Sequence, residues 1–147
     1  NAYVQSIDVS VEVWVRIGDY STCCGAYWAF GAAQFEIAPS SSTTNVYVVG
    51  SPWGPVSGGT NLDQWYCYTV THAAGTTYKI YVDGVLNSSH TLSSNTQFTT
   101  GEGSFGTNNP ASPSYLEGDI AVVRMYNRVL TASEVKQNYD STKVRFT

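Results

Sequence analysis

The stretch SIDVSVEVWVRIGD, residues 6–19, constrains the fold of this chain most strongly, because its residues alternate between apolar and polar. One face of the extended chain carries six apolar side chains: Ile7, Val9, Val11, Val13, Val15 and Ile17. The opposite face carries Asp8, Ser10, Glu12, Trp14 and Arg16. Since the side chains of a strand alternate between its two faces, the pattern predicts a long strand with one face against a core.

The rest of the chain has the composition and spacing of short strands joined by turns. Charged residues make up 12% and aromatic residues 14% of the chain, a balance that favours pleated, half-buried surfaces. Hairpins are expected near Gly31, at residues 73–76 and at Asp83-Gly84, a dipeptide that suits a two-residue turn. Strands at intervals of roughly ten residues predict an all-β, antiparallel sandwich or barrel. At a length of 147 residues we expect a single domain, residues 1–147.

One short helix is predicted near the end of the chain by the segment NRVLTASEVKQNYD. Thr131 is placed to be its N-cap and Glu134 to be its third residue, which is the pattern of a capping box. Leu130 and Val135 form the apolar pair of a hydrophobic staple, which fixes the direction in which the chain enters the helix. We expect the helix to lead into a last strand, KVRF at 143–146, and to cover an open end or edge of the sandwich.

Charge and hydropathy exclude two classes of partner. The chain has 7 basic and 11 acidic residues, a net charge of −4, and no basic run, so we expect no nucleic-acid partner. It has no apolar run long enough to span a bilayer, so we expect no membrane partner. The sequence begins at Asn1 without a methionine, and we expect further residues to precede it.

The cysteines leave two interpretations open. Cys23, Cys24 and Cys67 are an odd number and lack the paired spacing of a zinc site. Either they are small buried thiols, or Cys67 forms a disulfide with one of the two neighbouring cysteines.

Two long stretches, WYCYTVTHAAGTTYKIYVDGVL and GDIAVVRMYNRVLTASEVKQNYDSTKVRF, resemble the laminin-G-like domains of the concanavalin A-like lectin/glucanase superfamily. The positions that carry the resemblance are Trp65, Tyr81 to Gly84, Gly118, Ile120, Val123 to Arg128, Leu130, Thr131 and Glu134. Earlier in the chain, VSVEVWVRI resembles another recurrent strand of the family, with Glu12 and Trp14 in the expected places. The resemblance implies an antiparallel jelly-roll sandwich of two sheets with one short C-terminal helix.

One departure from the family pattern concerns polar groups on the last strand. Where the family has a short acidic pair after the isoleucine, this chain has Ala121 and Val122. The chain end NYDSTKVRF is similar to laminin-G-like domains of tailed-phage structural proteins, such as fibres, whiskers and capsid decorations, although secreted bacterial proteins carry similar ends.

The acids and histidines do not form a catalytic pattern. Retaining glycosidases need two carboxyl groups about 5 Å apart, whereas Glu12 has only Asp8 on its face, and Glu36 has no acidic neighbour. His72 and His90 have no serine or cysteine in a nucleophile setting, and we expect both to be solvated side chains near strand ends. The sequence therefore predicts a protein that is not an enzyme and has no catalytic residues.

Calcium is the one metal ion that the sequence leaves possible. Laminin-G-like domains often hold an ion at a loop rim, and the resemblance makes Asp19 and Asp63, together with Asn108 and Asn109, weak candidates for oxygen ligands. No other cofactor is expected.

The candidates for ligand binding are aromatic residues in or near loops. Sugar recognition needs flat apolar faces and a few polar groups held above a rigid scaffold, and the candidates are Trp53, Tyr20, Tyr115, Asn108 and Asn109. Trp28 is better explained as core, and we assign Trp14 and Trp65 to structure. Trp53 could equally be an anchor for a protein neighbour.

Together these features predict a non-enzymatic adhesion or accessory domain of a phage virion structural protein. It would bind a surface glycan or a neighbouring virion protein, at the virion surface. The alternatives are a purely architectural module that forms homo-oligomers or decorates a capsid without binding glycan, and an extracellular domain of a secreted bacterial adhesin.

Overall fold

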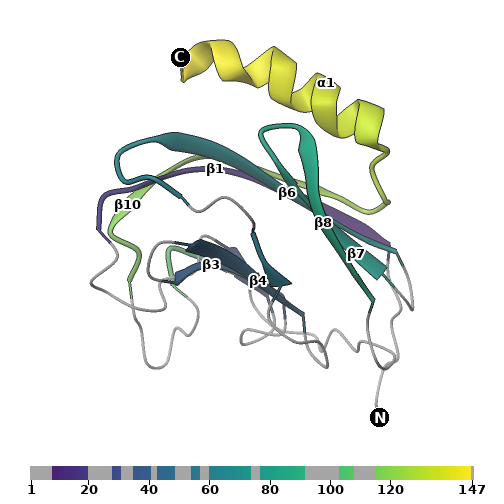
Figure 1. Cartoon of the computed structure of the whole chain (residues 1–147), viewed down its shortest axis with the longest axis horizontal. Coiled ribbons are helices and arrows are strands. Elements are labelled where there is room, and N and C mark those ends of the chain that lie inside the picture. Colours follow the sequence, from purple (N-terminus) through teal and green to yellow (C-terminus); the bar gives the residue numbers. More distant parts are fainter. Residues whose placement is uncertain are drawn as a thin grey trace.

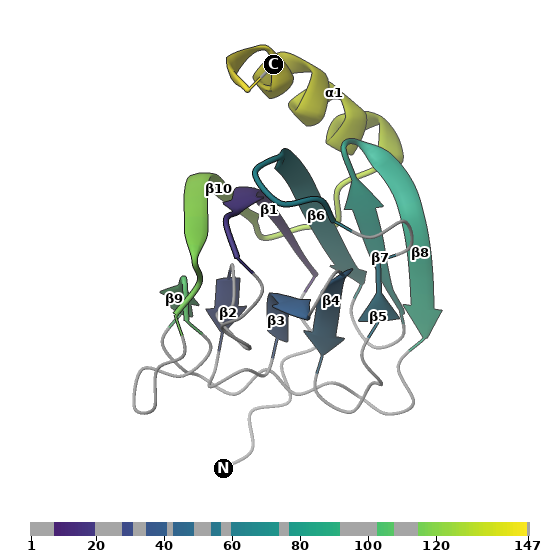
Figure 2. The ribbon, with the colours of Figure 1, turned by 60° about the vertical axis from the view of Figure 1, so that its left-hand side comes forward.

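The computed structural model describes the residues in the ranges 8–19, 28–30, 35–40, 43–48, 54–56, 60–73, 77–91, 103–107 and 115–146. They form two five-stranded antiparallel sheets and one helix in three layers (Figures 1 and 2). Sheet A has, in spatial order, β10 (Gly118–Tyr126), β1 (Val9–Ile17), β6 (Trp65–Ala73), β7 (Thr77–Val82) and β8 (Val85–Thr91). Sheet B has β5 (Gly54–Pro55), β4 (Thr43–Val48), β3 (Phe35–Ser40), β2 (Trp28–Phe30) and β9 (Gly103–Phe105). This confirms the prediction of an all-β, antiparallel jelly-roll sandwich.

The core lies between the two sheets and contains the apolar face of the first strand. Its fully buried members come from both sheets: Val11, Val13, Val15, Ile17, Ile37, Val56, Tyr66, Tyr68, Val70, Tyr78 and Ile80. Three hydroxyl groups beside it are hydrogen-bonded to one another, since the hydroxyls of Thr44 and Thr60 lie 3.0 Å from that of Tyr68. The alternation that predicted the strand β1 is thus confirmed.

The hairpin between β7 and β8 turns at Asp83-Gly84, as predicted. Both residues have positive φ, 50° and 78°, as a two-residue turn of this type requires. The turn is fastened to β6, because the amide of Cys67 donates to Asp83 Oδ1 at 2.9 Å. Cys67 is a free, buried thiol whose pKa is raised by burial. This agrees with the first interpretation of the cysteines; Cys23 and Cys24 lie outside the described residues.

The helix α1 (Ala132–Thr142) begins where the sequence predicts. Thr131 is its N-cap, and the two hydrogen bonds of the capping box are formed with Glu134. Leu130 and Val135 are both buried and pack together with Tyr81, as the hydrophobic staple requires. The sequence therefore specified both the first residue of the helix and the direction in which the chain enters it.

The position of the helix differs from the prediction. It lies across the outer face of sheet A, rather than on an end or edge of the sandwich (Figures 1 and 2). Trp14 stacks against Tyr139 and Phe146, with ring centroids 5.5 and 4.5 Å apart, and Phe146 also contacts Trp65 at 4.7 Å. Beneath the helix, the fully buried Glu12 pairs with Arg124. Both faces of β1 are therefore buried, and Trp14 and Trp65 are structural, as predicted.

Two further predictions were wrong. Residues 143–146 do not form a last strand: Lys143–Arg145 is a 3₁₀ helix, η1, which continues α1 and places Phe146 against the two tryptophans. His72 is 0% exposed rather than solvated, because it lies between Val9 and Tyr78 in sheet A. His90 is only partly exposed and stacks on Tyr78.

Among the described residues, no helix has the length and apolar character that crossing a membrane needs.

Candidate functional site

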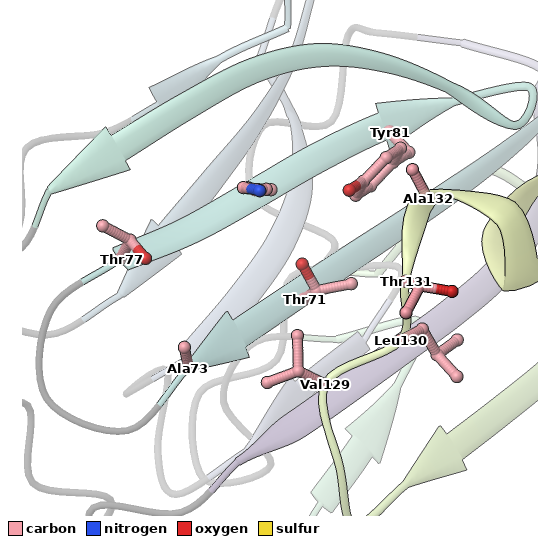
Figure 3. A pocket seen from close by; sticks show the side chains of 9 residues that line it. Thr71, Ala73, Thr77, Tyr81, Val129, Leu130, Thr131 and Ala132 are labelled. Atoms are coloured by element: carbon pink, nitrogen blue, oxygen red, sulfur yellow. The ribbon is translucent and has the colours of Figure 1, made fainter.

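A hollow of about 400 Å³ lies on the outer face of sheet A, beside the start of α1 (Figure 3). Its volume is in the range of small-ligand sites, about 300–1,000 Å³. It is lined by Thr71, Ala73, Thr77, Lys79, Tyr81, Val129, Leu130, Thr131 and Ala132. The first five residues belong to β6 and β7 and form its floor, whereas the segment 129–132, which leads from β10 into α1, forms its wall.

The floor follows from strand alternation. In the register of β6 and β7, Thr71 is opposite Lys79 and Ala73 is opposite Thr77. Residues directly opposite each other in antiparallel strands project from the same face. On its other side, Thr71 is opposite Ser10 of β1, a residue of the polar face that the sequence identified. The floor and the side chains beneath α1 therefore share one face of sheet A.

The wall is held in place by Ser10, which is fully buried. Its hydroxyl donates to the carbonyl of Arg128 at 2.9 Å, and it accepts from the amide of Leu130 at 2.9 Å. Leu130 packs against Tyr81 and Val135. One hydroxyl group thus ties the segment between β10 and α1 to the sheet, on both sides of Val129, and fixes the distance between wall and floor.

Two residues of the hollow are almost fully buried but leave their hydroxyl groups open to a ligand. Thr71 is 2% exposed and Tyr81 3% exposed, and Figure 3 shows both hydroxyl oxygens directed into the hollow. No hydrogen bond to either hydroxyl is found among the described residues, so both hydroxyls are left to solvent or to a ligand. Burial raises the pKa of Tyr81, so its hydroxyl keeps its proton at neutral pH and can donate.

The structure brings some of the loop residues predicted from the sequence to one corner, at the other end of β6. The amides of Gly18 and Asp19 donate to the carbonyl of Glu117 at 2.9 and 3.4 Å, and that of Asp63 donates to the carbonyl of Ile17 at 2.7 Å. Among the described residues, no group of three or more His, Cys, Asp or Glu side chains is arranged to hold a metal ion. Calcium binding at Asp19 and Asp63 stays a prediction.

Tyr115 is 65% exposed and pairs with Thr107 in an isolated β-bridge. It precedes Glu117 by two positions and therefore lies near the same corner. The other candidates, Trp53, Tyr20, Asn108 and Asn109, lie outside the described residues, and their role in binding stays a prediction. The two ends of β6 are roughly 25 Å apart, at about 3.3 Å per residue, so this corner and the hollow are separate sites.

The two acids considered for catalysis occupy different environments. Glu12 is fully buried beneath α1 and paired with Arg124, so it is closed to a ligand. Glu36, on β3, is 3% exposed, and burial raises its pKa to about 7. Neither acid lines the hollow.

Sequence reasoning missed the residues of the hollow. The alternating segment TYKIY did indicate that Thr77, Lys79 and Tyr81 share a face. Nothing in it indicated that a helix from a distant part of the chain would begin over this face and enclose part of it.

The chain is similar in sequence to a known family and in fold to solved structures. A laminin G family model, described as the concanavalin A-like lectin/glucanases superfamily, matches residues 1–136. A native heptameric SAP-like pentraxin from Limulus polyphemus is similar, with a TM-score of 0.71 at 13% identity over 94% of this chain and 72% of its own. No curated protein sequence matches the chain.

Two other similar structures belong to proteins named as glycoside-degrading enzymes. Domain 4 of an extracellular arabinanase from Geobacillus stearothermophilus, in complex with arabinotriose, has a TM-score of 0.65 at 19% identity, over 88% of this chain and 65% of its own. The sialidase of Trypanosoma rangeli has a TM-score of 0.71 at 17% identity, and the match covers 97% of this chain but 24% of the sialidase. At such identities the similarity concerns the fold alone.

Proposed function

Because the chain belongs to the concanavalin A-like lectin/glucanases superfamily, we propose that it is a non-enzymatic laminin-G-like accessory domain that binds carbohydrate in the hollow beside α1. The observation that carries the proposal is the pair of hydroxyls on the buried residues Thr71 and Tyr81, which face the hollow without a protein partner among the described residues. Both hydroxyls face an open hollow, so a ligand rich in hydroxyl groups can exchange hydrogen bonds with them in place of water.

The rest of the lining also suits a sugar. Carbohydrate sites combine apolar contacts for the C–H groups of the ring with a few polar groups that fix its orientation. The hollow supplies Ala73, Val129 and Leu130 beside the hydroxyls of Thr71 and Tyr81. The arabinanase domain described above was solved in complex with arabinotriose, which supports carbohydrate as a ligand of this fold.

The alternative that the hollow hydrolyses a glycan depends on acidic residues in its lining. The superfamily includes glucanases, and hydrolysis of a glycosidic bond requires a pair of carboxyl groups beside that bond. No Asp or Glu lines the hollow. We therefore propose binding without hydrolysis, and incubation of the bound glycan with the protein should leave the glycan intact.

The first experiment is a screen of the purified chain on a glycan array, with calcium and again with EDTA. For a glycan that binds, Tyr81→Phe and Thr71→Val each remove one hydroxyl and preserve the side-chain shape. We expect each to weaken binding about 5- to 150-fold, since a broken hydrogen bond costs about 1–3 kcal/mol. Tyr115→Phe, at an exposed tyrosine outside the hollow, is the matched control.

The same variants distinguish binding in the hollow from binding at the loop residues that the sequence predicted. Loss of binding in Trp53→Ala or Tyr115→Ala, with full binding in Tyr81→Phe and Thr71→Val, would contradict the hollow and support the loops instead. Weaker binding in EDTA would support calcium ligands at Asp19 and Asp63.

For the biological setting, we propose a structural protein at the surface of a phage virion, as the similarity of the chain end to such proteins implies. Mass spectrometry of purified particles would test this location, and detection of the domain in secreted bacterial protein instead would contradict it.

An architectural role is the second candidate. Met125 and Phe105 are large exposed apolar side chains on β10 and β9, which are edge strands of the two sheets, and exposed apolar groups on edge strands favour association. Light scattering that finds an oligomer, together with silence on the glycan array, would support this second role over carbohydrate binding.

A further inference from the structure

The distribution of ion pairs singles out one cation. The chain has 7 lysine and arginine residues, and all of them are described. Five form ion pairs with acids: Arg16, Arg124, Arg128, Lys136 and Lys143. Lys79 and Arg145 have no ion pair among the described residues. Of these two, Lys79 lines the hollow.

The charge of Lys79 is not compensated within the hollow, because none of the nine lining residues is acidic. The nearest acid along the wall segment is Glu134, and it is already engaged. Its carboxylate lies 2.8 Å from Arg128 Nη1 and accepts from the amide of Thr131 at 2.8 Å. The hollow therefore has a net positive charge in a chain whose net charge is −4.

The start of α1 adds to this positive character. Thr131 and Ala132 line the hollow, and the helix has 11 residues. The amide groups of the first helical turn have no carbonyl partner within the helix. The capping box supplies partners for the amides of Thr131 and Glu134, which leaves those of Ala132 and Ser133. The positive end of the helix dipole thus lies at the wall, where an anion is favoured.

Two side chains that are more than nine-tenths buried direct their hydroxyls into the same space, so the ligand would meet polar groups as well as positive charge. Thr71 is directly opposite Lys79 in the sheet, and Thr71 and Tyr81 are 2% and 3% exposed. A ligand that satisfies both sets of groups has hydroxyls or ring oxygens on one part and a negative charge on another.

We infer that the ligand is a saccharide with an anionic substituent, a carboxylate or a sulfate, and that Lys79 binds this substituent. The inference rests on the proposed function, since it names the class of sugar that the same hollow takes. Lys79 and the start of α1 select the charge, whereas Thr71 and Tyr81 hold the sugar whatever its charge.

The test compares matched pairs of sugars by isothermal titration calorimetry. The pairs are a glucuronide against the glucoside, sialyllactose against lactose, and a sulfated galactoside against the unsulfated one. We expect the anionic member of at least one pair to bind about two- to fivefold more tightly, the range for an exposed charged contact. A preference in the first two pairs alone identifies a carboxylate, and one in the third alone identifies a sulfate.

Substitutions assign the preference to Lys79. In Lys79→Gln most of the preference for the anionic member should be lost, since only the start of α1 still favours the charge, and the neutral sugar should be unaffected. Lys79→Arg should keep the preference. Arg145→Gln removes the other unpaired, exposed cation and should change nothing.

The outcomes separate this inference from the proposed function. Equal binding of neutral and anionic sugars, weakened by Tyr81→Phe but not by Lys79→Gln, would overturn the inference and leave carbohydrate binding intact. Failure to bind either member of any pair would overturn both.

Discussion

The prediction with the clearest dependence on pH concerns Glu36. This residue lies on β3, the middle strand of sheet B, and is 3% exposed. Burial disfavours the ionised carboxylate and raises its pKa from 4.5 to about 7. Between these two values the folded chain retains a proton that the unfolded chain releases. The free energy of unfolding should therefore fall as the pH rises from about 4.5 to about 7, and stay at the lower value above it.

The size of the effect follows from the two pKa values. One pH unit corresponds to 1.36 kcal/mol, so a carboxyl group whose pKa moves from 4.5 to about 7 destabilises the folded chain by about 3 kcal/mol at pH 8. Glutamine has nearly the same shape and cannot ionise. We therefore expect Glu36→Gln to stabilise the protein by up to about 3 kcal/mol at pH 8, and to leave its stability nearly unchanged at pH 4.

Urea denaturation followed by far-UV circular dichroism at pH 4, 5.5 and 8 measures these differences. Glu117→Gln, at an exposed acid, is the matched control and should have little effect at any pH. An equal effect of Glu36→Gln at pH 4 and pH 8, or destabilisation at pH 8, would refute burial of an ionisable group as the cause.

Two other predictions concern the contact between α1 and sheet A. Arg124→Met leaves the buried carboxylate of Glu12 without its cation and should destabilise the protein by about 3–5 kcal/mol, measured by urea denaturation. The double variant Arg124→Met, Glu12→Gln should recover most of this stability. A loss below about 1 kcal/mol in the single variant would contradict a buried ion pair. Gly84→Ala should destabilise by about 1–2 kcal/mol, because φ is +78° and the new Cβ would lie 3.0 to 3.1 Å from atoms of Tyr139 and Lys136. Gly106→Ala, with φ +74° and no atom within 4 Å of its Cβ, isolates the backbone part of the effect, and an equal loss in both variants would show that the helix contact contributes nothing.

Much of the fold could be predicted because its signals are local. The alternation from Ile7 to Ile17 depends only on the period of a strand, and its part from Val9 onward is the strand β1. The capping box of Thr131 and Glu134 depends only on residues three positions apart. Asp83-Gly84 specifies its turn through backbone conformations that few other residues adopt. Each of these elements begins or turns where the sequence indicates.

The position of α1 could not be predicted, because it depends on contacts between distant segments. A capping box determines where a helix starts but not which surface it covers. Glu12 and Trp14, on the polar face of the first strand, gave no sign that this face would be buried by residues more than one hundred positions later. His72 was misjudged for a related reason: its position near the end of a strand does not reveal which face of the sheet is closed by the second sheet.

The hollow could not be predicted from a single motif either, because its lining residues come from β6, β7 and the segment 129–132. Strand alternation in TYKIY groups the floor residues Thr77, Lys79 and Tyr81. The unusual feature is that two hydroxyls without a partner among the described residues face the same hollow as a lysine without an ion pair there. It arises only when the wall is tied down by Ser10 through its two hydrogen bonds.

The length of α1 explains why a hollow exists at all. With 11 residues the helix is about 16 Å long, whereas the nine residues of β6 span about 25 Å. The helix begins near Tyr81 and runs toward the end of the sheet that holds Trp65, where Phe146 packs, so it does not extend over the half of β6 that contains Thr71 and Ala73. A helix that started one turn earlier would place side chains over Thr71 and fill the space. The capping box at Thr131 therefore sets the boundary of the candidate binding site as well as the first residue of the helix.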